Sequence, residues 1–170
     1  MYYPKRTLIL TALAAMAVGS GLHFLYDLFP NGVTALLAPV NESLWEHVKL
    51  IYWPYLAAAL WLNRGRPGGI RPWLAVLLLL CAAVPAAGFL YHILLGGEAV
   101  WVDLALSYGA MALGFWLPTR TSGPFRGPLW ALTIPAVAAL GVVIGLFTLY
   151  PPENILFANL SAANWFLLPC

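Results

Sequence analysis

The sequence predicts an all-α polytopic integral membrane protein, with about five transmembrane helices packed in one bundle. Two features of its composition support this prediction: 62% of the 170 residues are hydrophobic and only 8% are charged. Soluble domains carry roughly 25% charged residues, and a soluble domain of about 150 residues still leaves about 30% of its unfolded-state surface exposed. Water cannot accommodate so much apolar surface, so lipid is the expected solvent. The same composition excludes a disordered chain, and no basic patch indicates nucleic-acid binding.

Five segments are long and apolar enough for a span of about 20 residues. They cover about residues 7–29, 41–63, 72–95, 99–117 and 128–150. The apolar runs are continuous rather than alternating, which favours helices over a β-barrel. The first span is expected to remain in place as a span rather than be removed as a signal peptide, because its apolar run continues to Phe29. The loops are short, so we expect neighbouring spans to pack antiparallel in a single transmembrane domain over residues 1–170.

Two apolar pieces lie outside the spans. Residues 33–37 predict a short interfacial segment between the first two spans. The tail, residues 151–170, has no charge after Glu153, and its last residues include Trp165, Phe166 and Leu167. We expect this tail to lie in the outer interface or over the mouth of the bundle.

The basic residues predict an orientation. In the five-span layout seven of the eight fall on one side, and Lys49 is the exception. The seven are Lys5, Arg6, Arg64, Arg66, Arg71, Arg120 and Arg126. Because Lys and Arg prefer the cytoplasmic side, we expect a cytoplasmic N-terminus and an extracytoplasmic C-terminus in the plasma or inner membrane.

The acidic residues and histidines fall on the opposite, outer side. They are Asp27, Glu42, Glu46, Glu98, Asp103, Glu153, His23, His47 and His92. Ionisable groups inside spans are costly and usually mark a function. Helical spacing puts the two members of several pairs on one helix face; the pairs are His23 with Asp27, Glu42 with Glu46, and Asp103 with Ser107. We therefore expect residues from four helices to converge on one polar pocket near the outer face.

Each of these residues also has a purely structural interpretation. Asn41 is a plausible N-cap of the second span, and Glu42 would then lie in its first turn, where the helix dipole favours an anion. Glu46 and Lys49 could neutralise each other, and His23 and Asp27 could form a structural pair. Pro54 and Pro85 should kink the second and third spans and free the carbonyls of Leu50 and Cys81.

The clustering on one side favours a functional site over these separate explanations. The candidate catalytic residues are His23, Asp27, Glu42, Glu46 and His47. The candidate ligands of a divalent metal such as zinc are His23, His47, His92 and Asp103, because imidazole and carboxylate suit that ion. The candidate binding residues are Asn41, Lys49, Tyr91 and Ser107.

Three stretches carry a resemblance to a known family: His-Phe-Leu-Tyr-Asp at 23–27, Ala-Pro-Val-Asn-Glu-Ser-Leu-Trp-Glu-His at 38–47 and Tyr-Pro-Pro at 150–152. Along its length the chain resembles small multi-pass bacterial membrane proteins of unknown function. Its three histidines are similar to the ligand set of ceramidase-like hydrolases, although the HxxxH pair is absent. His23, Asp27, Glu46 and Pro54 are similar in pattern to the sterol isomerase and sigma-2 receptor group.

Three functions fit these observations. The first is a membrane-embedded enzyme acting on a lipid or apolar substrate, either through metal-activated water or through a buried carboxylate as general acid with a histidine relay. The second is a non-enzymatic protein that binds or transports an ion, a proton or a small molecule. The third is a structural accessory subunit, with membrane lipid as the expected partner in every case.

Overall fold

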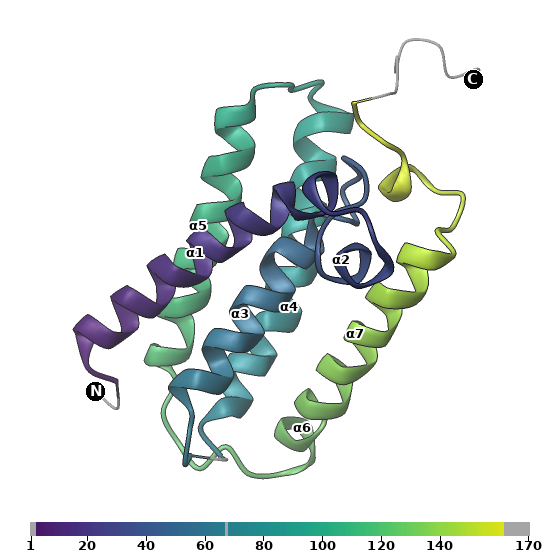
Figure 1. The fold of residues 1–170 in the computed structure, drawn as a ribbon. Helices are drawn as coiled ribbons and strands as arrows, with labels where there is room; N and C mark the ends of the chain where they lie inside the picture. Colours follow the sequence, from purple (N-terminus) through teal and green to yellow (C-terminus); the bar gives the residue numbers. More distant parts are fainter. Residues whose placement is uncertain (1–2, 67, 162–170) are drawn as a thin grey trace.

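The computed structural model describes residues 3–66 and 68–161, and every regular element in this part of the chain is a helix. The long helices are α1 (Lys5–Leu28), α3 (Val48–Leu62), α4 (Ile70–Gly88), α5 (Val100–Arg120) and α7 (Thr133–Leu149). The short ones are α2 (Gly32–Leu37), the π-helix η1 (Phe89–Leu94), α6 (Pro128–Ala131) and the 3-10 turn η2 (Ile155–Phe157). Successive long helices run in alternating directions and pack as a bundle (Figure 1). The predicted all-α membrane bundle is confirmed.

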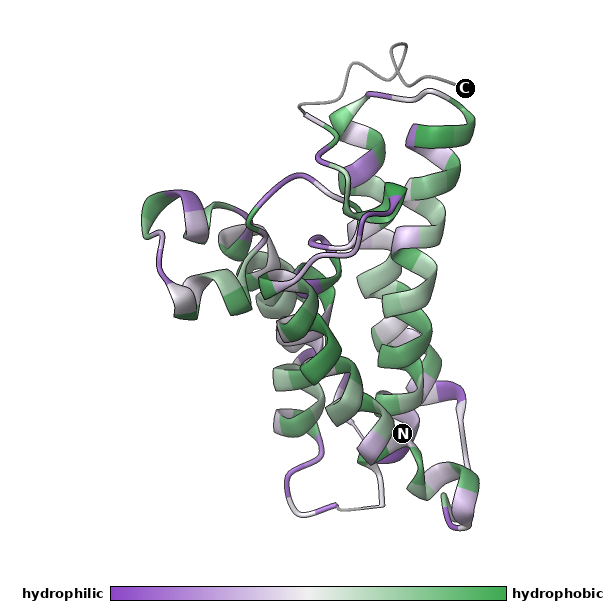
Figure 2. Cartoon of the chain, turned by 90° about the vertical axis from the view of Figure 1, so that its right-hand side faces the viewer, coloured by the Kyte–Doolittle hydropathy of each residue, from purple (hydrophilic) through white to green (hydrophobic). Residues whose placement is uncertain are grey.

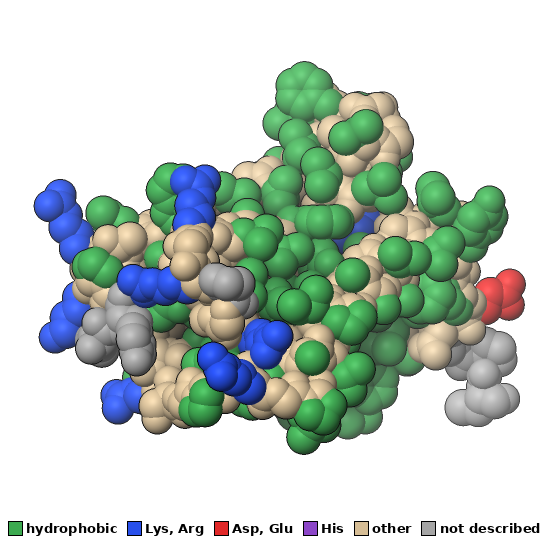
Figure 3. Space-filling model, turned by 90° about the horizontal axis from the view of Figure 1, so that it is seen from below, with side chains coloured by type: hydrophobic (Ala, Val, Ile, Leu, Met, Phe, Trp, Pro, Cys, Tyr) green, Lys and Arg blue, Asp and Glu red, His purple; other side chains and the backbone are tan. Residues whose placement is uncertain are grey.

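Four helical segments are long and apolar enough to cross a membrane. They are Lys5–Leu28, Ile70–Leu94, Val100–Arg120 and Pro128–Leu149, and they match the first, third, fourth and fifth predicted spans to within a few residues. Hydrophobic residues cover the helices, and hydrophilic ones concentrate in the connecting loops (Figure 2). Lys and Arg side chains gather on the face seen from below in Figure 3. We call this the basic end of the bundle.

The prediction that the second span begins as a helix at Asn41 is wrong. Helix α3 begins only at Val48 and has 15 residues, and residues 38–47 form bends and turns before it. Asn41 does not cap this helix, because its side-chain oxygen accepts a hydrogen bond from the Ser43 amide at 3.0 Å and closes a local turn. Glu42 therefore lies outside the first helical turn and does not share a helix face with Glu46.

Helix α3 lies at the centre of the bundle and contacts α1, α4 and α5. Two tyrosines bind it to its neighbours: the Tyr52 hydroxyl donates to the Val137 carbonyl of α7 at 2.9 Å, and the Tyr55 hydroxyl donates to the Gly114 carbonyl of α5 at 2.7 Å. Trp73 of α4 is fully buried against this core. Polar groups surrounded by lipid must find partners within the protein, and these hydroxyls do so across helix interfaces.

Helix α1 packs closely against α3 at Gly19. A Cβ atom on this glycine would lie 2.8 Å from the Leu50 carbonyl oxygen, so a larger residue would force the helices apart. Pro54 has no N–H to bind that carbonyl within α3. The close contact holds α1 against the N-terminal end of α3, and His23 follows one turn later, facing the 38–47 segment.

The beginning of the C-terminal tail packs over the 38–47 segment. The Trp45 amide donates to the Leu156 carbonyl at 3.0 Å, and the Leu160 amide donates to the Glu42 carbonyl at 3.3 Å. Phe157 lies against Trp45 and Phe147, with ring centroids 5.3 and 5.4 Å away. These contacts hold residues 156–160 against the segment that precedes α3. Trp165, Phe166, Leu167 and Cys170 lie outside the described residues.

Candidate metal site of histidines and glutamate

Three of the predicted site residues meet at the end of the bundle opposite the basic end, which we call the acidic end. His23 comes from α1, whereas Glu42 and His47 come from the 38–47 segment that precedes α3. One ligand atom from each lies within 4.8 Å of the other two, and this is the only such group of three His, Cys, Asp or Glu residues in residues 3–66 and 68–161. The Glu42 carboxylate lies between the imidazoles, with Oε1 3.7 Å from His23 Nε2 and Oε2 3.3 Å from His47 Nε2. All three side chains are partly exposed.

The backbone fixes the tautomer of His47. Its Nδ1 lies 2.8 Å from the Ser43 carbonyl oxygen, which can only accept, so Nδ1 carries a proton. In neutral His47 the Nε2 lone pair therefore faces Glu42. Two facing acceptors repel each other unless a proton or a cation lies between them. A backbone partner on the second ring nitrogen is the usual support of a metal-binding histidine.

The two partners shift each other's pKa in opposite directions. Burial disfavours the charged form of His47, but the hydrogen bonds with Glu42 and Ser43 and the charges of Glu42 and Asp103 outweigh it, so its pKa is raised. The hydrogen bond from His47 lowers the pKa of Glu42, and the nearby histidines outweigh the opposing effect of burial. Each member of the pair thus stabilises the charged form of the other.

His23 supplies an atom with no protein partner. Its Nδ1 is buried and makes no hydrogen bond within the described part of the chain, while its Nε2 faces Glu42. A buried polar atom without a partner is costly and calls for a ligand or water. Rotation of the ring can present either nitrogen to the centre of the cluster.

The other two predicted ligands, His92 and Asp103, form a separate pair. His92 Nε2 lies 2.8 Å from Asp103 Oδ1, and His92 Nδ1 lies 2.8 Å from the Gly97 carbonyl oxygen. The predicted four-residue set of His23, His47, His92 and Asp103 is therefore divided between two groups. His92 lies in the π-helix η1, a feature that often marks functional sites and that the sequence pattern did not indicate.

Glu46 lies in a buried structural network. Its Oε2 lies 2.5 Å from Lys49 Nζ and accepts from the Val40 amide at 2.9 Å. Lys49 Nζ also donates to the carbonyls of Ala35 at 2.7 Å and Ala38 at 3.1 Å. The pair thereby joins the end of α2 to the start of α3.

The remaining predicted residues lie outside the cluster. Asp27 is exposed, and its side chain forms no hydrogen bond or ion pair with the residues that the structure describes. The Tyr91 hydroxyl accepts from the Ala99 amide at 3.0 Å, and its ring packs edge-on against His92. Asn41 shapes the 38–47 segment. Ser107 is half-buried on α5.

The cluster suits zinc in residue type, and its side chains must draw together to bind the ion. Tetrahedral zinc with bonds of about 2.0–2.2 Å holds its ligand atoms about 3.4 Å apart, so a pair at up to 4.8 Å must close by about 1.4 Å. Half-exposed side chains can rotate that far. The sequence pattern indicated Glu42 as a catalytic candidate but not as a metal ligand, and it did not predict the turn that brings Glu42 to the two histidines.

The fold and the cluster define a class: a helical membrane-type protein with a His–Glu–His group beside one end of its bundle. Within that class, the chain belongs to a family of unknown function, DUF6512, whose match covers residues 2–165. This confirms the resemblance to uncharacterised membrane proteins. No curated protein and no solved structure matches the chain.

Proposed function

We propose that this protein is a membrane-embedded, metal-dependent hydrolase, with His23, His47 and Glu42 as the metal ligands. The observation that carries the proposal is the convergence of these three side chains from two separate segments. Two His and one Glu, with a position open for water, are the ligand set of catalytic zinc in several soluble hydrolases. A metal held there would activate that water as a nucleophile.

The location of the cluster favours a substrate from the membrane. His23 lies in the last two turns of α1, a predicted span, and the cluster is partly exposed. A lipid head group on the acidic side would reach the cluster while its chains stayed in the bilayer. The positive-inside rule assigns that side to the extracytoplasmic leaflet.

The metal content of the purified protein tests this proposal. We expect about one zinc or other divalent transition ion per chain by mass spectrometry, and its loss in His47→Ala and Glu42→Gln. His92→Ala is the matched control, because it removes a histidine that also faces a carboxylate but lies outside the cluster. No metal in the folded wild type after incubation with zinc, or equal loss in His92→Ala, would refute the assignment.

A second reading uses no metal. His47 and His92 each donate Nδ1–H to a backbone carbonyl and turn Nε2 toward a carboxylate, an arrangement that suits proton transfer. The negative charge of Asp103 also contributes to the raised pKa of His47. Proton flux into vesicles containing the purified protein, measured with a pH-sensitive dye, would support this reading if His47→Ala and His92→Ala both abolish it.

A further inference from the structure

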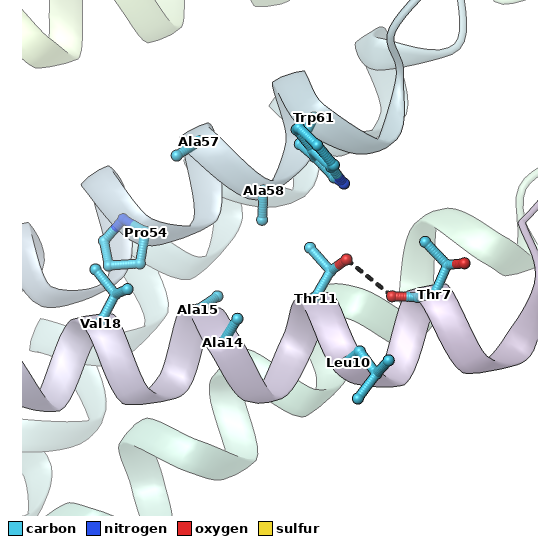
Figure 4. Close-up of a pocket in the computed structure, with 10 residues that line it drawn as sticks. All are labelled: Thr7, Leu10, Thr11, Ala14, Ala15, Val18, Pro54, Ala57, Ala58 and Trp61. Atoms are coloured by element: carbon cyan, nitrogen blue, oxygen red, sulfur yellow. Dashed lines mark hydrogen bonds between the residues drawn. The ribbon is translucent and has the colours of Figure 1, made fainter.

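An open groove of about 530 Å³ runs between α1 and α3, along the N-terminal half of α1 and away from His23. Its walls include Leu10, Ala14, Ala15, Pro54, Ala58 and Trp61, with Trp61 near one end and Pro54 near the other (Figure 4). Thr11 is one of two polar side chains in it, and its hydroxyl already donates to the Thr7 carbonyl at 2.8 Å. The lining therefore suits an apolar occupant.

The length of the groove matches one lipid leaflet. It extends along α1 from Thr7 to Val18, which corresponds to about 16 Å at roughly 1.5 Å per residue. Half of a hydrocarbon core of about 30 Å is about 15 Å. Above this stretch, the close contact of Gly19 with Leu50 closes the space between the helices. One acyl chain entering from the basic end fits this length.

Positive charge surrounds the open end. Lys5 and Arg6 directly precede Thr7 and are exposed. The guanidinium of Arg64, also exposed, lies 3.7 Å from the ring centroid of Trp61, a lining residue. The sequence has no Asp or Glu before Asp27 or between Glu46 and Glu98, so nothing acidic on α1 or α3 neutralises this end. Basic side chains at a membrane surface attract anionic lipids.

We propose that this groove binds one acyl chain of an anionic phospholipid, whose phosphate lies against Lys5, Arg6 and Arg64. The apolar walls hold the chain, and the three basic side chains select the head group. This lipid site is independent of the metal cluster. It lies at the opposite end of α1 and does not depend on the proposed hydrolase function.

Fluorescence quenching in lipid nanodiscs tests the proposal. Brominated phosphatidylglycerol and brominated phosphatidylcholine are compared at equal mole fraction in a phosphatidylcholine bilayer, and the Trp61 signal is the difference between wild type and Trp61→Phe. We expect phosphatidylglycerol to be favoured about fivefold for each basic side chain that it engages. Equal quenching by the two lipids would overturn the proposal.

Matched variants separate the groove from the general lipid surface. Ala14 is exposed in the groove, so Ala14→Phe should fill it and remove the preference for phosphatidylglycerol. Ala17→Phe makes the same change at an exposed alanine of α1 that does not line the groove, and it should keep the preference.

Two further measurements test the role of the basic side chains and the identity of the molecule in the groove. Arg64→Gln should lower the preference about fivefold and leave quenching by phosphatidylcholine unchanged; an unchanged preference would contradict the head-group assignment. If Ala14→Phe instead turns an oligomer of the wild type into a monomer in light scattering, the groove binds a second copy of the chain and the lipid proposal fails.

Discussion

Glu42 and Glu46 are four residues apart in the same turn segment, yet they occupy opposite environments. The Glu46 side chain is 3% exposed and binds Lys49 and the Val40 amide, whereas the Glu42 side chain is 44% exposed and faces two imidazoles. The oxygen of Glu46 that faces Lys49 and Val40 has donors from both a cation and the backbone. The Glu42 carboxylate faces Nε2 of His47, which carries a lone pair when that histidine is neutral, because its Nδ1 holds the proton. A carboxylate whose oxygen already accepts from several donors has a structural role. A carboxylate that faces a lone pair has room for a ligand between the two groups.

The largest effect on stability is expected at the Glu46 pair. Lys49→Met leaves the buried Glu46 charge without its partner and should lower the free energy of unfolding by about 3–5 kcal/mol. The double variant Glu46→Gln with Lys49→Met should recover part of that loss, because neither charge remains. Unfolding by SDS from detergent micelles, followed by circular dichroism, measures both. A loss below about 1 kcal/mol in Lys49→Met would contradict the structural role.

The largest effect on metal binding is expected at the Glu42 cluster. Glu42→Gln should weaken zinc binding by more than the roughly 100-fold that loss of an outer partner can cost, with little change in unfolding. Competition with a chromogenic chelator measures the affinity. The comparison between the two glutamates fails if Glu46→Gln, in protein that remains folded, weakens zinc as much as Glu42→Gln does.

The pH dependence of zinc binding sharpens the same comparison. Zinc needs the deprotonated Nε2 of His47. Glu42 and His23 lie next to this ring, and the charge of Asp103 also raises its pKa. Since the pKa of His47 is raised, protons begin to displace the metal at a higher pH than at an ordinary histidine. Affinity should fall about tenfold per pH unit below that pKa, whereas the lowered pKa of Glu42 delays its own protonation to more acidic pH. A flat profile from pH 8 to 5 would contradict His47 as a ligand.

The smallest effect is expected far from either glutamate. Tyr55→Phe removes the hydrogen bond to the Gly114 carbonyl and should cost about 0.6–1.7 kcal/mol, the range from average to largest for hydrogen bonds between membrane helices. SDS unfolding measures this loss, and zinc affinity should stay unchanged. A change in zinc affinity would show that the core and the cluster are coupled.

The sequence predicted the helices where local composition decides the outcome. Continuous apolar runs and Pro or Gly breaks located four spans closely. Residues 33–37, predicted only as a short interfacial segment, lie in α2, where Asn31 and Thr34 make a capping box. The predicted convergence of residues from four helices is not seen, because His92 and Asp103 pair with each other apart from His23, Glu42 and His47. The start of α3 was missed because the Asn41 side chain binds the Ser43 amide and favours a turn.

By itself, the sequence determined the solvent, the number of apolar segments and the separation of basic from acidic residues. These follow from composition and order along the chain, which no packing can change. Only the tertiary structure decided which carboxylate met which cation. Once α3 began at Val48 rather than Asn41, Glu42 turned toward His23 and His47, and Glu46 turned inward to Lys49. Which side chains pair depends on where the backbone turns. Hydrogen bonds to neighbouring segments set that turn, and the order of residues along the chain does not reveal them.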